Sequence, residues 1–476
     1  MTTAPSMLWH DYETFGTSVQ KDLPCQFAAI RTDMDLNVIG KPINIISQIA
    51  NDYLPNPGAC LVTGITPQQT LRDGRTEADF ARQVAKAMSQ PNTCVAGYNS
   101  IRFDDEVSRH LFYRNFIDPY AREWRNGNSR WDIIDLARAC YALRPDGIKW
   151  PTKDDGTPSF KLEDLCAANE LEHGHAHDAL SDVTATIALA KLIKTQQPRL
   201  YDYAFSLRSK HTVLKQFDFS RPSVVLHISS KLPARQGCAS WVMPVCPHPV
   251  NANAIIAIDL NHEVQPLLEL EPEELRRRLY LSHEQLEGLP RPGLKLIHIN
   301  RSPFVTTAKA MTQENAERLG LNRDYCLDNF KQLSQAEGLA TRLTSVYASE
   351  REAMTDDIDH ALYSGGFLTD EERRWCEQVH DTDPEQLTSL ADKTQNQKLR
   401  DMLFRYRARN YSHTLTESEL QRWHSHRQFR LTDPESPASI TLAAYLEEIE
   451  RLSVEHSSDP NKQAILRALY HYAENL

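Results

Sequence analysis

The sequence predicts an α/β protein in which a mixed sheet flanked by helices is followed by a strand-rich region and then by a helical region. Short apolar or alternating runs come first in the chain, and helical patterns follow them. After Gln197-Pro198 four further strand candidates lie close together, and from Thr312 onward helical patterns dominate. These changes place boundaries near residues 200 and 355, which gives three domains over residues 1–198, 199–354 and 355–476.

In the first region, turn residues separate three strand candidates, over residues 7–9, 26–32 and 43–49. An apolar run predicts another strand at residues 93–98. Helical spacing predicts helices over residues 76–89, 104–116, 133–143, 162–169 and 178–194. The last of these is expected to be amphipathic, with an apolar stripe through Val183, Ile187, Ala190 and Ile193. The proline-containing stretch 51–64 is expected to be irregular.

The second region has a different pattern. Its strand candidates have short polar or proline-rich connections and cover residues 224–228, 238–245, 254–260 and 294–299. They favour a small β-barrel or a curled sheet, with a helix inserted at residues 271–281. The last hundred or so residues contain no convincing strand, which favours an all-helical third region.

Composition is that of a globular protein with no membrane segment. Of the 476 residues 41% are hydrophobic and 25% charged, and no apolar run approaches the length that spans a bilayer. The N-terminus lacks the basic start and apolar core of a signal peptide, so a cytoplasmic location is the default expectation. The nine cysteines are scattered and form no Cys-x-x-Cys, which indicates reduced packing residues rather than disulfides or a zinc cage.

The net charge of −11 argues against a nucleic-acid partner, but the charge is unevenly distributed. Residues 107–149 carry eight Lys and Arg against five acids, and residues 194–215 carry five against one. Residues 398–427 carry seven against three. These basic stretches could line one groove for a polyanion. For any single stretch, a solvated helix face is the favoured alternative.

An acidic pair stands close to the N-terminus. Asp11 and Glu13 directly follow the apolar run 7–9, and side chains two apart on a strand point to the same face. Like charges at close range are unfavourable unless something neutralises them, and a hard divalent cation that prefers oxygen ligands would do so. The alternative is a strand end at which both acids face water. From this pair alone, that alternative is favoured.

Three further candidates come later in the chain. Asp104 stands where a strand passes into a helix N-terminus, a kind of place where functional groups collect. His177 precedes a helix whose second turn presents Asp182, so an imidazole and an acid could face one pocket. Asp105 competes with its neighbour, and two other nearby histidines compete with His177. Only the five-residue interval to Asp182 selects among the histidines.

The order Asp-x-Glu, Asp, and His-x-x-x-x-Asp resembles that of the DEDDh 3′-to-5′ exonucleases, which are ribonuclease H-like. The resemblance implies that Asp11, Glu13, Asp104 and Asp182 hold two Mg²⁺ ions, with Asp11 bridging both and Asp104 acting through water. It implies that His177 takes the proton from the attacking water, because imidazole titrates near neutral pH. The all-oxygen set suits Mg²⁺, with Mn²⁺ as a substitute, and suits zinc poorly.

Similarity to one family extends over essentially the whole chain. The runs that resemble bacterial exonuclease I cover residues 10–16, 26–32, 128–132, 138–145, 326–329 and 406–410. That resemblance implies a ribonuclease H-like exonuclease domain with a mixed sheet, an SH3-like β domain and an all-α C-terminal domain. Lys161 departs from the family, because it stands where an Arg commonly contacts substrate. The positive charge is kept, but the bidentate fork of Arg is lost.

The resemblance also implies an activity and partners. The expected enzyme is a monomer that digests single-stranded DNA processively from the 3′ end, releasing nucleoside 5′-monophosphates in DNA repair and recombination. Contact with the acidic C-terminal tail of single-strand DNA-binding protein is expected. Thr63, Gly64 and Ile65 resemble the segment that packs on the terminal nucleotide, although an ordinary turn entering a helix explains them as well.

Further residues are expected to contact the DNA. Besides Lys161, and Glu13 in a second role, they are basic or aromatic side chains in the basic stretches: Arg109, Tyr120, Trp124, Arg138, Arg144 and Lys210. Core packing or a solvated face is the alternative for each. Two other functions stay open, a DEDDh exoribonuclease or proofreading exonuclease and a single-strand nucleic-acid-binding scaffold with a dead site. The long C-terminal extension disfavours the first, and the complete catalytic set disfavours the second.

Overall fold

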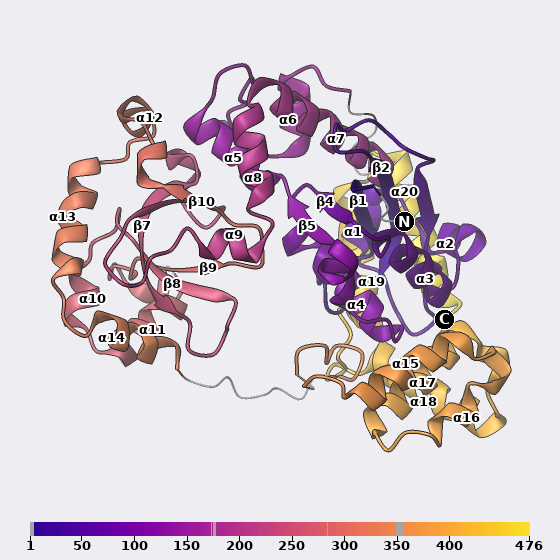
Figure 1. Cartoon of the computed structure of the whole chain (residues 1–476). Coiled ribbons are helices and arrows are strands. Elements are labelled where there is room, and N and C mark those ends of the chain that lie inside the picture. The colour runs from indigo at the N-terminus through magenta and orange to yellow at the C-terminus, as the bar shows by residue number, and fades with distance from the viewer. Residues whose placement is uncertain (1–3, 173, 175–177, 283, 349–356, 365) are drawn as a thin grey trace. The chain divides into compact units, whose positions relative to one another are not determined.

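The computed structural model describes the chain except for residues 1–3, 173, 175–177, 283, 349–356 and 365 (Figure 1). The chain folds into two compact units. The first unit combines three segments, Met1–Ser129, His173–Thr184 and Ala353–Leu476. The second unit combines two, Arg130–Glu172 and Ala185–Glu352. The last quarter of the chain therefore belongs to the same compact unit as the N-terminal strands.

A five-stranded sheet with the order β3-β2-β1-β4-β5 begins in the first unit. Its strands are β1 (Ser6–Thr14), β2 (Pro24–Thr32), β3 (Ile43–Ile46), β4 (Thr93–Gly97) and β5 (Ser129–Asp132). Because β1 pairs antiparallel with β2 and parallel with β4, the predicted mixed sheet is confirmed. One expectation was wrong: β1 does not end at Trp9, and Asp11 and Glu13 lie inside the strand. Alternating apolar residues carry the strand through both acids to Thr14.

Helices surround this sheet and form the C-terminal part of the first unit. They are α1 (Pro57–Thr63), α2 (Pro67–Asp73), α3 (Glu77–Met88), α4 (Asp104–Arg114), α15 (Asp370–Asp381), α16 (Thr388–Ala391), α17 (Gln397–Asn410), α18 (Glu417–Thr432), α19 (Leu442–Glu455) and α20 (Pro460–Glu474). The helices predicted at residues 76–89 and 104–116 are confirmed as α3 and α4.

The expectation that residues 51–64 are irregular was wrong, because α1 lies there. The Asn56 side chain accepts a hydrogen bond from the Ala59 N–H at 3.3 Å, which caps the helix. Pro57 takes the first helical position, where its missing N–H costs nothing. Gly64 ends the helix with φ of 72°, a left-handed conformation that glycine adopts without strain. These three residues are a helix signature that the sequence already contained.

Three apolar clusters hold the first unit together. Under the sheet, Leu8 and Phe27 pack with Val84 of α3 and Leu111 of α4. A second cluster joins α1 to the C-terminal helices α19 and α20. The third joins α15, α16 and α17 to Ala78 of α3 and to Phe116, just after α4. The C-terminal helices are thus packed on the N-terminal region rather than attached only through the chain.

The second unit is built on an antiparallel sheet with the order β10-β6-β7-β8-β9. Its strands are β6 (Val225–Ile228), β7 (Ala239–Pro247), β8 (Ala254–Asp259), β9 (Leu294–His298) and β10 (Phe304–Thr307). The four predicted strands are confirmed, and β10 was not predicted. In the described part of the chain no strand follows β10, which confirms the helical pattern expected from Thr312 onward.

The helices of the second unit precede and follow its sheet. They are α5 (Ile134–Leu143), α6 (Leu162–Ala168), the later turns of α7 (Ala179–Gln196), α8 (Pro198–Ser206), α9 (Lys210–Leu214), α10 (Gln265–Glu269), α11 (Pro272–Tyr280), α12 (Gln313–Arg318), α13 (Arg323–Ser334) and α14 (Leu339–Tyr347). Helix α7 was expected to bury one apolar stripe. It buries more of its circumference, because Ala185, Thr186 and Leu189 are buried as well.

Two further observations bear on the whole chain. All nine cysteines are free thiols and eight of them are buried, which confirms that they are packing residues. Among the described residues, no helix combines the length and the apolar character needed to cross a bilayer.

Candidate active site

Strand β1 and helix α7 bring three of the predicted acids together. Asp11 and Glu13 lie two residues apart on β1 and therefore project from the same face. Asp182 comes from the first turn of α7, not from the second turn as the sequence suggested. A carboxylate oxygen from each of the three lies within 4.8 Å of the others. Residues separated by about 170 positions in the sequence thus share one small space.

Asp104 lies beside this cluster. It opens α4, and its Oδ1 accepts a hydrogen bond from the Tyr12 N–H at 3.2 Å, between the two acids of β1. The competing candidate Asp105 has a different partner, because its Oδ1 accepts from Arg122 at 2.7 Å in a buried ion pair. The two neighbouring acids therefore face different surroundings, and Asp104 is the one next to β1.

The surroundings of the cluster disfavour negative charge. Burial raises the pKa of Asp11 well above its usual value, and the carboxylates of Asp104, Glu13 and Asp182 raise it further. Burial, followed by Asp182, Asp104 and Asp178, raises the pKa of Glu13 to about 8. Glu13 is only 8% exposed, so the alternative in which the acids simply face water is wrong.

This donor set fits a hard divalent cation. Its members are carboxylates with no thiol or imidazole among the three, and oxygen ligands are what Mg²⁺ and Mn²⁺ prefer. A bound cation would also neutralise charges that the fold otherwise holds at an energetic cost. Across the described ranges, no other group of three or more His, Cys, Asp or Glu side chains has this geometry.

Two residues that the sequence did not single out support the cluster. The Asp178 side chain accepts a hydrogen bond from the Ser181 N–H at 3.2 Å, just ahead of α7. The Gln26 amide on β2 donates to the other Asp178 oxygen at 3.3 Å and to Asn44 at 3.0 Å. Since Gln26 pairs with Glu13 across the sheet, it joins the start of α7 to the acidic strand. His177 lies outside the described residues.

The predicted DNA contacts of the first unit differ in how exposed they are and in whether other side chains already contact them. Arg109 is 6% exposed, and its guanidinium donates to Glu106 at 2.7 Å and to Glu123 at 2.8 Å, so two carboxylates neutralise it. Tyr120 is partly buried beneath that guanidinium. Trp124 is 64% exposed.

The segment Thr63, Gly64 and Ile65 forms the turn between α1 and α2. The Gly64 N–H donates to the Cys60 carbonyl at 2.9 Å, and the Ile65 N–H donates to the Thr63 hydroxyl at 3.2 Å. The Ile65 side chain is buried in the cluster that joins α1 to α19 and α20. The turn that the sequence offered as an alternative is therefore present.

The other predicted DNA contacts belong to the second unit. Lys161 is exposed and immediately precedes α6. Arg138 is buried and forms an ion pair with Asp135 at 2.6 Å. Arg144 is exposed, and Lys210 is exposed with its Nζ donating to the Asn253 side chain at 2.7 Å.

Comparison with known families agrees with the fold and the cluster. Residues 8–190, which contain every member of the acidic cluster, match the family model described as Exonuclease. The mixed sheet and the acidic cluster therefore belong to an exonuclease domain. This enzyme class removes nucleotides from a chain end.

The remaining matches are more specific. Residues 208–349 match the Exonuclease I SH3-like domain, and residues 356–476 match the Exonuclease I C-terminal domain. The chain belongs to the bacterial exonuclease I family. The expected combination of an α/β exonuclease domain, an SH3-like domain and a helical C-terminal region is confirmed.

The similarity to individual proteins extends over nearly the full length. The chain is 46% identical over 473 residues to Exodeoxyribonuclease I of Escherichia coli (strain K12), covering 99% of this chain and 98% of the relative. It is 42% identical over 474 residues to Exodeoxyribonuclease I of Haemophilus influenzae (strain ATCC 51907 / DSM 11121 / KW20 / Rd), with 99% and 98% covered.

Solved structures show the same similarity. The crystal structure of E. coli Exonuclease I in complex with a dA16 oligonucleotide matches with a TM-score of 0.96 at 46% identity, covering 99% of both chains. The zinc ion bound form of the E. coli ExoI-ssDNA complex matches with a TM-score of 0.95 at 44% identity, again covering 99% of both. A structure of SSB/Exonuclease I in complex with the inhibitor CFAM matches with a TM-score of 0.92 at 44% identity, covering 99% of this chain and 100% of that one.

Proposed function

We propose that this chain degrades single-stranded DNA processively from the 3′ end and releases nucleoside 5′-monophosphates, in DNA repair and recombination. The observation that carries the proposal is the convergence of Asp11, Glu13 and Asp182 within an exonuclease domain. Relatives named Exodeoxyribonuclease I, and a similar structure holding a dA16 oligonucleotide, support DNA as the substrate.

Divalent ions would be held by Asp11, Glu13, Asp104 and Asp182. When bound, such ions activate the attacking water and offset the charge that develops on the phosphoryl and leaving oxygens. We propose two Mg²⁺ ions, with Mn²⁺ as a substitute. The zinc-bound form of the E. coli complex shows that this relative also takes zinc, so zinc belongs among the ions to be compared.

The chain's own residues supply the remaining chemistry. His177 would accept the proton of the attacking water, because a neutral imidazole is a competent base near pH 7. The backbone N–H of Tyr12 holds Asp104 next to β1, and Asp178 holds the start of α7, which carries Asp182. These contacts orient the carboxylates before any ion or substrate arrives.

Substrate contacts are proposed from the family resemblance and from exposure. Trp124 offers an open face for stacking a base, while Lys161, Arg144 and Lys210 are exposed cations that suit phosphates. The segment Thr63, Gly64 and Ile65 is proposed to meet the terminal nucleotide through its backbone, since the Ile65 side chain is buried, and Glu13 is proposed to contact the same nucleotide.

Two of the proposed contacts are less suited to phosphate. Arg109 and Arg138 are already engaged with carboxylates, so they are weaker candidates than the exposed cations. Arg109 lies over one face of the Tyr120 ring, so a base would stack on the opposite face.

The proposal extends to partners. One similar structure is described as SSB/Exonuclease I, which supports contact with single-strand DNA-binding protein, and we propose that the acidic tail of that protein is the contacting segment. We further propose that the chain acts as a monomer in the cytoplasm. Sedimentation of the purified protein with and without the tail peptide tests both the stoichiometry and the contact.

The decisive experiment uses single strands labelled at either end. With Mg²⁺, a 5′-labelled DNA strand should shorten in steps from the 3′ end, and a 3′-labelled strand should release labelled mononucleotide at once. Neither should occur in EDTA. Matched RNA strands decide between a deoxyribonuclease and an exoribonuclease, and excess trap DNA added after the first cut tests processivity. Release from the 5′ end, or equal digestion of RNA, would refute the proposal.

A further inference from the structure

A hydrogen-bonded amide on β2 lies beside the acidic cluster. The Gln26 Nε2 donates to the Asp178 carboxylate at 3.3 Å and to the Asn44 side chain at 3.0 Å. Gln26 is buried, and it stands directly opposite Glu13 in the antiparallel pairing of β1 and β2. Paired residues of neighbouring strands project from the same face of a sheet, so the amide shares the face that carries Asp11 and Glu13.

Asp178 connects this amide to the start of α7 through three separate atoms. Its Oδ1 accepts from Gln26, its Oδ2 accepts from the Ser181 N–H at 3.2 Å, and its backbone carbonyl accepts from the Asp182 N–H at 3.0 Å. The contact with Ser181 satisfies a donor of the first helical turn. Gln26 is therefore linked through a single residue to the backbone of Asp182, one of the acids proposed to bind metal.

The chemistry of the two side chains fixes the direction of their hydrogen bond. An ionised carboxylate only accepts, so Gln26 must turn its NH₂ group toward Asp178. The amide also carries no charge. A Lys at this position would place an ammonium on the face that holds Glu13, where it would compete with a metal ion, and a Glu would add a further acid. Glutamine holds Asp178 without either effect.

The acidic cluster is sensitive to the position of α7. Carboxylate oxygens of Asp11, Glu13 and Asp182 lie within 4.8 Å of one another. Burial is the main cause of the raised pKa of Glu13, and the Asp178 carboxylate is among the acids that raise it further. Metal–ligand distances vary by only about 0.2 Å, so even a small shift of the first turn of α7 would take Asp182 out of reach of a shared ion.

We infer that Gln26 is a positioning residue for hydrolysis, which acts through Asp178 to hold the first turn of α7 where Asp182 can bind a divalent ion together with Asp11 and Glu13. Gln26 would contribute no ligand atom to the ion. Residues that orient metal ligands typically contribute about 10–100-fold to metal affinity or activity. The inference rests on the proposed function, but ion binding can be measured without any hydrolysis.

The test is a Mn²⁺ titration of the DNA-free protein, in which electron paramagnetic resonance measures the free ion. Gln26→Ala should weaken Mn²⁺ binding about 10–100-fold. Gln83→Ala is the matched control, because Gln83 on α3 also donates to a carboxylate, that of Asp79 at 2.9 Å, but lies outside the acidic cluster. The control should bind Mn²⁺ as the native protein does.

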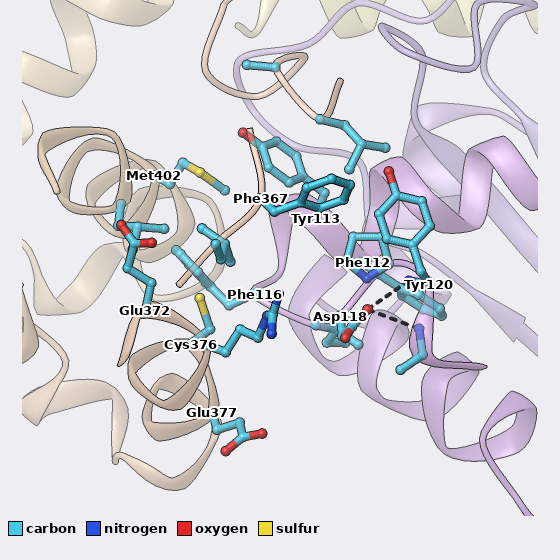
Figure 2. A pocket seen from close by; sticks show the side chains of 18 of the residues that line it. Phe112, Tyr113, Phe116, Asp118, Tyr120, Phe367, Glu372, Cys376, Glu377 and Met402 are labelled. Carbon is cyan, nitrogen blue, oxygen red and sulfur yellow. Dashed lines mark hydrogen bonds between the residues drawn. The ribbon is translucent and has the colours of Figure 1, made fainter. Parts of the chain in front are cut away.

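DNA binding should be unaffected, which separates positioning from substrate contact. The aromatic cavity of about 620 Å³ against the later turns of α4 has neither Gln26 nor Asp178 in its lining (Figure 2). Gln26 is also not among the residues proposed to contact DNA. In EDTA, Gln26→Ala should therefore bind single-stranded DNA as the native protein does. In digestion at one fixed Mg²⁺ concentration it should lower kcat and leave KM within about twofold.

Exchanging the two side chains provides a rescue. Gln26→Glu places two carboxylates against each other, and Asp178→Asn replaces one of the two accepting oxygens with an NH₂ group. The double variant Gln26→Glu/Asp178→Asn reverses donor and acceptor and keeps the total charge, and its Asn can still accept from the Ser181 N–H. Both single variants should lose Mn²⁺ affinity, and the double variant should regain at least about tenfold over the weaker of them.

The outcomes are distinguishable. Native-like Mn²⁺ binding by Gln26→Ala would overturn the inference, even if urea unfolding showed a loss of stability, because the role would then be structural only. A double variant no better than the weaker single variant would also overturn it, and so would a native protein that binds no Mn²⁺. If the native protein bound Mn²⁺ but digested no single strand, the proposed function would fail, while the titrations would still decide the role of Gln26.

Discussion

The acidic cluster leads to a testable prediction for the metal-free protein. Replacing one of its carboxylates should raise the free energy of unfolding. Glu13→Gln removes a charge and keeps the shape of the side chain. Burial and three neighbouring acids raise the pKa of Glu13 from 4.5 to about 8. An acid whose pKa is higher in the folded than in the unfolded protein binds extra protons on folding, so the folded state loses stability as pH rises from 4.5 through 8.

The size of the effect follows from that shift. Each unit of pKa shift corresponds to about 1.4 kcal/mol, and at pH 7.5 about three units of the Glu13 shift contribute to the free energy of unfolding. At pH 7.5 the raised pKa of Glu13 therefore costs the metal-free fold up to about 4 kcal/mol, relative to a carboxyl that keeps its usual pKa. Because Glu13 is 8% exposed, solvent screens little of this cost. We expect Glu13→Gln to raise the free energy of unfolding by about 1–4 kcal/mol at pH 7.5 and to flatten its dependence on pH.

Urea unfolding followed by circular dichroism, between pH 5 and pH 8.5, measures this directly. In EDTA the variant should be the more stable protein, whereas Mg²⁺ should stabilise the native chain more than the variant. Glu385→Gln is the control, because the Glu385 carboxylate is largely exposed. Its replacement should change the free energy of unfolding far less than Glu13→Gln does. If Glu13→Gln were less stable than the native protein in EDTA at pH 8, the argument from charge repulsion would be refuted.

Other changes probe the proposed chemistry and the fold. Asp182→Ala should abolish Mg²⁺-dependent hydrolysis with an unchanged circular dichroism spectrum, and residual activity of the folded variant would argue against the assignment. His177→Ala should slow cleavage severely while gel-shift binding of DNA persists. Asp359→Asn breaks buried ion pairs with Arg405 at 2.8 Å and Arg409 at 2.6 Å, and should cost about 3–5 kcal/mol in urea unfolding. Burial, with Arg114, His360 and Arg109, lowers the pKa of His110 to about 3. The free energy of unfolding of the native protein should therefore fall as the pH drops below 6.5, by about 2 kcal/mol at pH 5. In His110→Asn this fall should be smaller.

The sequence predicted the elements whose signals are local. Helices α3 and α4 have long apolar periodicities, and their predicted ends lie within two residues of the observed ones. The turn from β4 into α4 was also visible, and with it the place of Asp104. The convergence of Asp104 with the acids of β1 was suggested by resemblance to a family, because no spacing in the chain encodes a parallel pairing between β1 and β4.

The errors have physical reasons as well. Helix α1 is only seven residues long, too short for a periodic pattern, and only its caps mark it. Strand β10 is four residues long, and its pairing with the distant β6 stabilises it. Helix α7 is buried on more than one face because its neighbours cover it, which its own sequence does not specify.

The sequence also does not distinguish acids proposed to bind metal from acids that form stabilising ion pairs. Asp11 and Asp52 are identical in the sequence and both belong to the first unit. Burial and neighbouring carboxylates raise the pKa of Asp11, which makes a cation favourable there. Burial would also raise the pKa of Asp52, but the Arg409 guanidinium at 2.7 Å holds that pKa well below its usual range. The acids proposed to bind metal are thus surrounded by other acids, and only the folded chain shows which acids those are.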